Sequence, residues 1–256
     1  MVVIKIGVCG SIEDAVLVKE AGYDFLECTV VSLVPDNDQD FEKLYEKYKQ
    51  SPIPIETCNI LLPGHLRVTG PNVDFVQLET YINKALYRVN AIGADTVVFG
   101  SGGARSYPDG FSKEEAEKQI IQFLKMVAGV AEPLGITIVI EPLNQKESNI
   151  ITSVPEAIAL AEKVNRPSIQ VLADLYHMME EAEPIENIKP AGHLLQHVHV
   201  ADSSRLAPGT GDYPYDYLRE QLKSIGYDKR ISIECDWQDF SIEVKQAKKC
   251  LDRIFT

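Results

Sequence analysis

Short apolar runs alternate with longer segments of helical periodicity along this chain. Runs typical of strands fall at residues 4–9, 24–31, 54–61, 96–100, 136–141, 169–174, 194–200 and 230–234. Between them, patterns typical of helices fall near residues 11–21, 40–49, 73–92, 113–134, 154–164, 178–188, 214–225 and 241–254. This alternation predicts parallel strands joined by right-handed helical crossovers.

Eight strand–helix units predict an α/β fold, the closed (β/α)8 TIM barrel. An open doubly wound sheet is the alternative, and its first strand is often followed by a glycine-rich phosphate loop. The corresponding segment here, Gly10-Ser11-Ile12-Glu13, does not supply that loop. No linker rich in Pro, Gly and Ser divides the chain, so we expect a single domain over residues 1–256.

Four side chains able to bind a metal stand at the ends of four consecutive apolar runs. They are Glu141, Asp174, His199 and Glu234. In a (β/α)8 barrel the carboxyl ends of the strands share one face, and catalytic groups stand there. Each of these residues alone is more often a helix cap, an ion-pair partner or a core histidine. Their placement on the last four strands predicts that all four side chains meet at one point.

Three carboxylates at one point require compensation. Two carboxylates about 4 Å apart repel by about 4 kcal/mol at an effective dielectric near 20. Three such pairs approach the net stability of a typical domain. Protons or a divalent cation must relieve this repulsion. Three carboxylates and an imidazole favour Mn²⁺, with Mg²⁺, Co²⁺ or Zn²⁺ as alternatives.

Composition restricts the partners of the protein. Acidic residues outnumber basic residues by 38 to 25 and give a net charge of −13. This charge argues against binding to nucleic acid or to an anionic membrane surface. The five cysteines are widely spaced without a Cys-x-x-Cys pair, which is typical of free thiols in a reducing compartment. Because the first apolar run is too short for a signal peptide, we expect a cytoplasmic protein.

Three further residues near strand ends have an expected position or role. His197 shares a strand face with His199, and we expect it one layer deeper in the barrel. Glu27, near the end of the second run, either contacts substrate at the mouth or forms a salt bridge inside the barrel rim. Arg105, in a glycine-rich loop after the fourth run, is the only hint of a phosphate pocket.

The residues around these strand ends resemble a known family. The segments concerned are Glu141-Pro142-Leu143-Asn144 with Glu147, Asp174-Leu175-Tyr176-His177, His197-Val198-His199 with Arg205, and Ile233-Glu234. They are similar to the xylose-isomerase-like sugar isomerase/epimerase superfamily, near the ketose 3-epimerases and the hydroxypyruvate-isomerase-like proteins. The resemblance implies a homodimer or homotetramer with a small sugar as substrate. It also implies one divalent metal bound by Glu141, Asp174, His199 and Glu234, and sugar contacts from Glu147, His177 and Arg205.

The same resemblance implies an isomerase that acts through an enediolate. One of Glu141 and Glu234 removes a proton beside the carbonyl, and the other returns a proton from the opposite face. This chain departs from the ketose 3-epimerases at Gln145-Lys146, where they carry Arg-Phe.

Other functions remain as alternatives. The first is a metal-dependent dehydratase or lyase acting on a keto-polyol or keto acid. A metallonuclease of this fold brings several further histidines to its site, whereas this chain has five in all. A sugar-binding protein without catalysis has no need of all four ligands.

Overall fold

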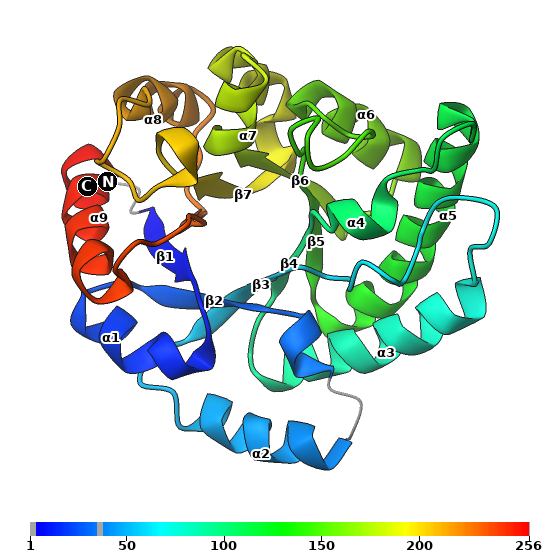
Figure 1. Ribbon diagram of the computed structural model, residues 1–256, viewed down its shortest axis with the longest axis horizontal. Helices are drawn as coiled ribbons and strands as arrows, with labels where there is room; N and C mark the ends of the chain where they lie inside the picture. Colours follow the sequence, from blue (N-terminus) through cyan, green and yellow to red (C-terminus); the bar gives the residue numbers. More distant parts are fainter. Residues whose placement is uncertain (1–3, 35–37, 256) are drawn as a thin grey trace.

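The computed structural model of this protein describes residues 4–34 and 38–255. Within these ranges, parallel strands pair in the order β1-β2-β3-β4-β5-β6-β7-β8 and close into a barrel. Helices surround the strands on the outside (Figure 1). The predicted (β/α)8 TIM barrel is therefore confirmed.

The strands are short, and their bounds lie within two residues of the predicted runs. They are β1 Lys5–Cys9, β2 Phe25–Thr29, β3 Ile55–Asn59, β4 Thr96–Phe99, β5 Thr137–Ile140, β6 Ile169–Asp174, β7 Leu195–Val200 and β8 Arg230–Ile233. The helices are α1 Ala15–Glu20, α2 Asp38–Lys49, α3 Phe75–Ala91, α4 Gly102–Arg105, α5 Lys113–Ala131, α6 Val154–Val164, α7 Leu175–Glu180, α8 Tyr215–Ser224 and α9 Phe240–Phe255.

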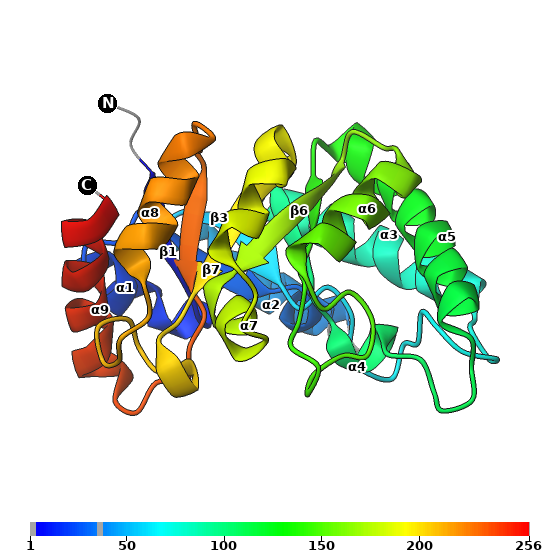
Figure 2. The ribbon, with the colours of Figure 1, turned by 90° about the horizontal axis from the view of Figure 1, so that it is seen from above.

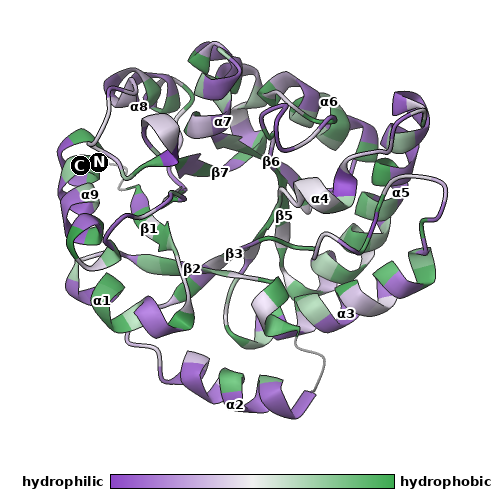
Figure 3. Cartoon of the chain, in the orientation of Figure 1, coloured by the Kyte–Doolittle hydropathy of each residue, from purple (hydrophilic) through white to green (hydrophobic). Residues whose placement is uncertain are grey.

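The barrel wall separates two apolar regions. The larger core lies between the strands and the surrounding helices, and Val98, Val139 and Leu172 form a small separate cluster. Gly7 leaves room for the ring of Phe25, because a Cβ at Gly7 would lie 2.3 Å from it. Hydrophilic and hydrophobic residues alternate along the surrounding helices (Figure 3). The largely hydrophilic α2 lies outside the ring formed by the other helices (Figures 1 and 3).

Two shifts in strand register lie within the barrel wall. Between β2 and β3 the register shifts just before Glu27, and between β6 and β7 it shifts just before Leu172. Such irregularities change the direction in which neighbouring side chains point. Beyond the second shift, Asp174 pairs directly with His199. The carboxyl ends of β6 and β7 therefore bring these two side chains side by side.

The segment after β6 differs from its prediction. α7 begins directly after Asp174, whose carboxylate accepts from the backbone N–H groups of Tyr176 and His177 at 2.7 and 3.3 Å. The helix ends before Pro184, and a 3-10 segment covers Ile185–Leu194. The single helix predicted near residues 178–188 is wrong, because proline lacks the N–H that a continuing helix needs.

Figure 2 shows the barrel from the side, with α4 and several connecting loops at one end of the strands. The carboxyl ends of the strands lie at that end, and the candidate site lies among them. Within the described residues, no helix combines the length and the apolar character needed to cross a membrane.

Candidate metal centre and active site

The four side chains predicted to bind a metal lie together at the carboxyl end of the barrel. Ligand atoms of Glu141, Asp174, His199 and Glu234 all lie within 4.8 Å of one another. His199 Nδ1 lies 3.0 Å from Glu141 Oε1, 3.4 Å from Glu234 Oε2 and 3.9 Å from Asp174 Oδ2. Residues separated by almost one hundred positions in the sequence therefore form one compact cluster.

Strand ends position each member of the cluster. Glu141 follows β5, Asp174 and His199 belong to β6 and β7, and Glu234 follows β8. The backbone N–H groups of Glu141 and Glu234 donate to carbonyls of β4 and β7 at 3.2 and 3.0 Å. Glu141, Asp174 and His199 are buried, whereas the Glu234 side chain is 18% exposed. The cluster is thus held by the barrel itself and opens to solvent on the Glu234 side.

Burial and neighbouring charges perturb the acids of this cluster. Burial and the charge of Glu234 raise the pKa of Glu141. Burial acts to raise the pKa of Glu234 as well, but the charges of His199 and Arg205 hold it below its usual value. Burial acts to lower the pKa of His199, and the carboxylates of Glu27 and Glu234 outweigh it, so that the pKa is raised. Negative charge at this point therefore favours any cation within reach.

The donor set fits a divalent cation. Carboxylate oxygens and an imidazole nitrogen are ligands that Mn²⁺ and related ions accept together. Glu141, Asp174 and Glu234 would supply the oxygens, and His199 Nδ1, which faces them, would supply the nitrogen. A bound cation relieves the repulsion among the three carboxylates, which otherwise depends on protons.

Arg205 lies beside this cluster. Its Nη2 donates to Glu234 Oε2 at 3.0 Å, and its Nη1 donates to Glu147 Oε1 at 2.9 Å. The guanidinium lies over the ring of Tyr176, 5.1 Å from the ring centroid. Ser204 and Arg205 both have left-handed backbone conformations, with φ of 59° and 58°. Non-glycine residues reach this conformation at a cost of about 1–2 kcal/mol each, so the surrounding loop must hold Arg205 in place.

Asp202 organises the loop that carries Arg205. Its carboxylate accepts from the backbone N–H groups of Ser203, Gly209 and Tyr213 at 2.9, 2.9 and 3.2 Å. Asp202 is 1% exposed, so these bonds are protected from water. The loop after β7 is therefore a fixed turn around a buried carboxylate.

His177 directs one ring nitrogen into the protein and leaves the other unpartnered. His177 Nδ1 accepts from the backbone N–H of Asn144 at 3.1 Å, and the Asn144 side chain donates to Glu147 Oε1 at 3.1 Å. A neutral imidazole that accepts at Nδ1 carries its proton on Nε2. That buried Nε2 lies 3.9 Å from Asp174 Oδ2 and has no hydrogen-bond partner among the described residues. It is a donor available to a ligand.

Of its two predicted positions, Glu27 takes the one inside the barrel, where its partners are hydroxyl and imidazole groups. It is fully buried, and its Oε2 accepts from Thr57 Oγ1 and Ser232 Oγ, each at 2.6 Å. His197 Nε2 lies 2.8 Å from Oε2, and His199 Nε2 lies 3.0 Å from Oε1. Burial acts to raise the pKa of Glu27, but the two histidines lower it well below its usual value. The expected position of His197, one layer deeper than His199, agrees with this network.

Sequence reasoning missed two residues of the site. Asn59 at the end of β3 donates from Nδ2 to Glu234 Oε1 at 2.8 Å. Cys9 at the end of β1 places its sulfur within 4.8 Å of ligand atoms of Glu27 and His199. The available signal was a polar residue at the end of each of these strands, the same signal that identified the four ligands.

Arg105 does not form a phosphate pocket, and that interpretation is wrong. The residue ends the short helix α4 and is fully buried. Its guanidinium donates to the backbone carbonyls of Phe99, Glu141 and Ile151 at 3.0, 2.7 and 3.1 Å. Its donors therefore join the end of β4, the end of β5 and the following loop, and they fix the backbone of Glu141.

Two curated proteins are similar in sequence to part of the chain. A ketose 3-epimerase from Arthrobacter globiformis is 35% identical over 109 residues, which cover 42% of this chain and 38% of that protein. A D-psicose 3-epimerase from Ruminiclostridium cellulolyticum is 28% identical over 160 residues, which cover 60% of this chain and 53% of that protein. The aligned segments thus span about half or less of these relatives.

The fold similarity extends over the whole chain. The crystal structure of a D-allulose 3-epimerase from Methylomonas sp. in complex with D-allulose superposes with a TM-score of 0.85 at 21% identity. The superposition covers 100% of this chain and 98% of that one. The family model described as a xylose isomerase-like TIM barrel matches residues 15–254. With nearly every described strand and helix inside that match, the chain belongs to the xylose isomerase-like TIM barrel family.

Proposed function

We propose that this protein is a divalent-metal-dependent sugar isomerase or ketose epimerase. The observation that carries the proposal is the convergence of Glu141, Asp174, His199 and Glu234 at the carboxyl end of the barrel. Arg205 beside them adds a cation that can contact a sugar oxygen. The names of the relatives, a ketose 3-epimerase and a D-psicose 3-epimerase, support the same class.

The proposed metal ligands are those four residues, and Mn²⁺ is the ion that we favour. Their mixture of carboxylate and imidazole suits Mn²⁺ better than Zn²⁺, which more often has additional His or Cys ligands. When bound, such an ion supplies positive charge that stabilises negative charge on sugar oxygens.

Glu141 and Glu234 are the proposed acid/base pair. One carboxylate takes the proton from the carbon next to the sugar carbonyl, the C–H electron pair becomes the C=C bond of an enediolate, and the C=O π pair moves onto the carbonyl oxygen. The other carboxyl group returns a proton to the same carbon from the opposite face, which inverts its configuration. β5 and β8 are separated by β6 and β7 around the barrel, so the two groups approach the site from different directions. Return of the proton to the neighbouring carbon instead gives isomerisation.

Glu147, His177 and Arg205 are the proposed sugar-binding residues. The unpartnered Nε2 of His177 can donate to a hydroxyl or carbonyl oxygen. Arg205 can donate to an oxygen that gains negative charge, and Glu147 can accept from a hydroxyl. The contact between Arg205 and Glu147 at 2.9 Å keeps both groups at one side of the site.

The charge around the site favours a sugar without phosphate. The guanidinium of Arg205 is paired with two carboxylates, and Lys146 Nζ lies 2.8 Å from Glu180 Oε2. Arg105 is buried among backbone carbonyls. Because each of these cations is already engaged, we propose an uncharged ketose or aldose as the substrate.

Deuterium exchange tests the proposal. The protein is loaded with Mn²⁺ and incubated with a panel of ketoses in deuterated water. The sugars are then recovered, freed of Mn²⁺ and examined by NMR. Exchange at C3 supports 3-epimerisation, and exchange at C1 or C2 supports aldose–ketose isomerisation. Loss of water from a substrate would assign the dehydratase or lyase function instead. No exchange with any sugar would refute the proposed function.

A further inference from the structure

The Glu27 carboxylate has a donor facing each of its oxygens. Thr57, Ser232 and His197 surround Oε2 at 2.6, 2.6 and 2.8 Å, and His199 Nε2 faces Oε1 at 3.0 Å. Glu27 lies in the barrel wall with none of its surface exposed, so water does not compete for these positions. A carboxylate accepts hydrogen bonds and donates none. Each group around Glu27 must therefore present its hydrogen to it.

This requirement decides which nitrogen of His199 carries the proton. With Nε2–H directed at Glu27 Oε1, a neutral imidazole keeps its lone pair on Nδ1. Nδ1 is the nitrogen that faces Glu141 Oε1 at 3.0 Å and Glu234 Oε2 at 3.4 Å. The lone pair needed for metal binding thus points toward the other proposed ligands.

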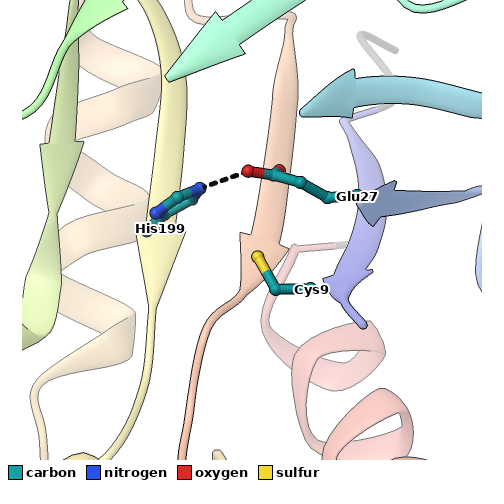
Figure 4. A group of neighbouring side chains, drawn as sticks. All are labelled: Cys9, Glu27 and His199. Carbon is teal, nitrogen blue, oxygen red and sulfur yellow. Dashed lines mark hydrogen bonds and ion pairs between the residues drawn. The ribbon is translucent and has the colours of Figure 1, made fainter. Parts of the chain in front are cut away.

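A second group of side chains could compete for a metal through the same histidine. Cys9, Glu27 and His199 project toward one another from β1, β2 and β7, and Figure 4 shows the bond between His199 and Glu27. Ligand atoms of these three residues also lie within 4.8 Å of one another. A metal bound there would need the lone pair of His199 Nε2. In the contact with Glu27 that nitrogen carries a proton instead, so it has no lone pair to offer. The two groups therefore exclude each other at His199.

We propose that Glu27 is a positioning residue that makes His199 bind the metal through Nδ1 and so assigns the metal to Glu141, Asp174, His199 and Glu234. The inference rests on the metal site of the proposed function. Glu27 acts through the ring of His199 and does not contact the ion. Acceptors that orient a ligating histidine typically contribute about 10–100-fold to metal affinity.

The first test identifies the ligating nitrogen in the unaltered protein. The ¹⁵N-labelled protein is loaded with Zn²⁺, and long-range ¹H–¹⁵N correlations of the histidine rings are recorded. Zn²⁺ is diamagnetic and readily accepts thiolate ligands, so it gives the Cys9 group its best chance. We expect a protonated Nε2 and a metal-bound Nδ1 for His199, assigned by the signal lost in His199→Asn. A metal-bound Nε2 would overturn the proposal.

The second test measures Mn²⁺ affinity by titration calorimetry. We expect Glu27→Leu, which removes both acceptor oxygens, to weaken the Kd about 10–100-fold. Glu27→Gln should have a smaller effect, because an amide oxygen turned toward His199 can still accept. The matched control is Glu56→Gln, which removes a carboxylate paired with Lys5 and Arg230 near the amino end of β3. It should leave the Kd unchanged.

The outcomes separate this inference from the proposed function. A folded Glu27→Leu protein with the wild-type Kd would overturn the inference, and if that variant does not fold, the NMR result on the unaltered protein decides. Neither measurement uses a sugar. Metal bound through Nδ1 without turnover of any ketose would leave the inference standing and refute the proposed function. Turnover of a ketose with metal bound through Nε2 would support the proposed function and overturn the inference.

Discussion

Replacement of Arg205 by methionine separates sugar binding from metal binding. Methionine keeps much of the side-chain length and removes the guanidinium. The variant loses the donors that face Glu147 and Glu234 at 2.9 and 3.0 Å and the contact with the Tyr176 ring. The four proposed metal ligands do not include Arg205, so the metal content should stay at the wild-type level. The substitution should therefore weaken only those steps in which a sugar oxygen accepts from the guanidinium.

The expected magnitude differs strongly between catalysis and stability. A hydrogen bond from a charged donor contributes about 1.5–3 kcal/mol, and each 1.4 kcal/mol is about tenfold. Loss of one such bond to the sugar therefore lowers kcat/KM about 10–100-fold. The ion pairs within the protein are partly exposed, with 23% exposure for Arg205 and 37% for Glu147. Their loss should lower the free energy of unfolding by less than about 1 kcal/mol.

The assay measures kcat/KM with the sugar that exchanges deuterium, and metal content by elemental analysis on the same sample. The matched control is Arg166→Met, which removes an arginine paired with Glu132 before β6. This control should keep the wild-type kcat/KM. Loss of metal from Arg205→Met would refute the assignment of Arg205 to the substrate. An unchanged kcat/KM would also refute it.

Four further predictions follow from the same structure. Glu141→Gln and Glu234→Gln should each reduce turnover by at least about 100-fold, measured with metal restored to saturation, and near-normal activity in either variant would exclude the two-glutamate mechanism. Chelation followed by dialysis should abolish activity, Mn²⁺ should restore it, and Mn²⁺ at about 100 times its Kd should stabilise the fold by about 2.7 kcal/mol. Arg105→Met leaves buried carbonyls without donors and should lower the free energy of unfolding by about 3 kcal/mol in urea titrations. Burial acts to raise the pKa of Asp95, but Arg230 outweighs it and holds that pKa below its usual value, so this pair stabilises the fold above the unfolded pKa of about 4. Asp95→Asn should lower the free energy of unfolding by about 0.5–1 kcal/mol at pH 7. This loss should shrink as the pH falls from about 4 toward the lower pKa of Asp95 in the folded protein.

The fold was predictable because the barrel repeats one simple pattern. Each strand is a short apolar run between polar segments, and the period changes from strand to helix eight times. That signal depends on local residues alone, so the strand bounds could be predicted to within two residues. The error in the helix after β6 comes from local signals that the composition hides. The segment near residues 178–188 has helical composition, but Asp174 starts α7 earlier and Pro184 prevents its continuation.

Apart from the family resemblance, the pattern of the sequence identified site residues only where they end a strand. Glu141, Asp174, His199 and Glu234 could be selected because their strands are clear in the sequence. The roles of Glu27 and Arg105 could not be settled in the same way. A charged residue near a strand end can face the mouth, the interior or the backbone of a neighbour, and sequence gives no measure of depth. Burial decides both cases, since neither residue is exposed.

The buried carboxylates of this barrel differ in how many hydrogen-bond donors and cations face them. Around Glu27, four donors face the two carboxylate oxygens, and the buried carboxylate is stable there for that reason. Around Glu141 and Glu234 the balance is incomplete, since their carboxylates lie close together and only part of their charge is met by His199 and Arg205. Burying carboxylates whose charge is only partly compensated lowers the stability of a protein, because they lose their contacts with water. This imbalance is concentrated at the open end of the strands, directly beside the Glu27 network, where a bound cation would complete it.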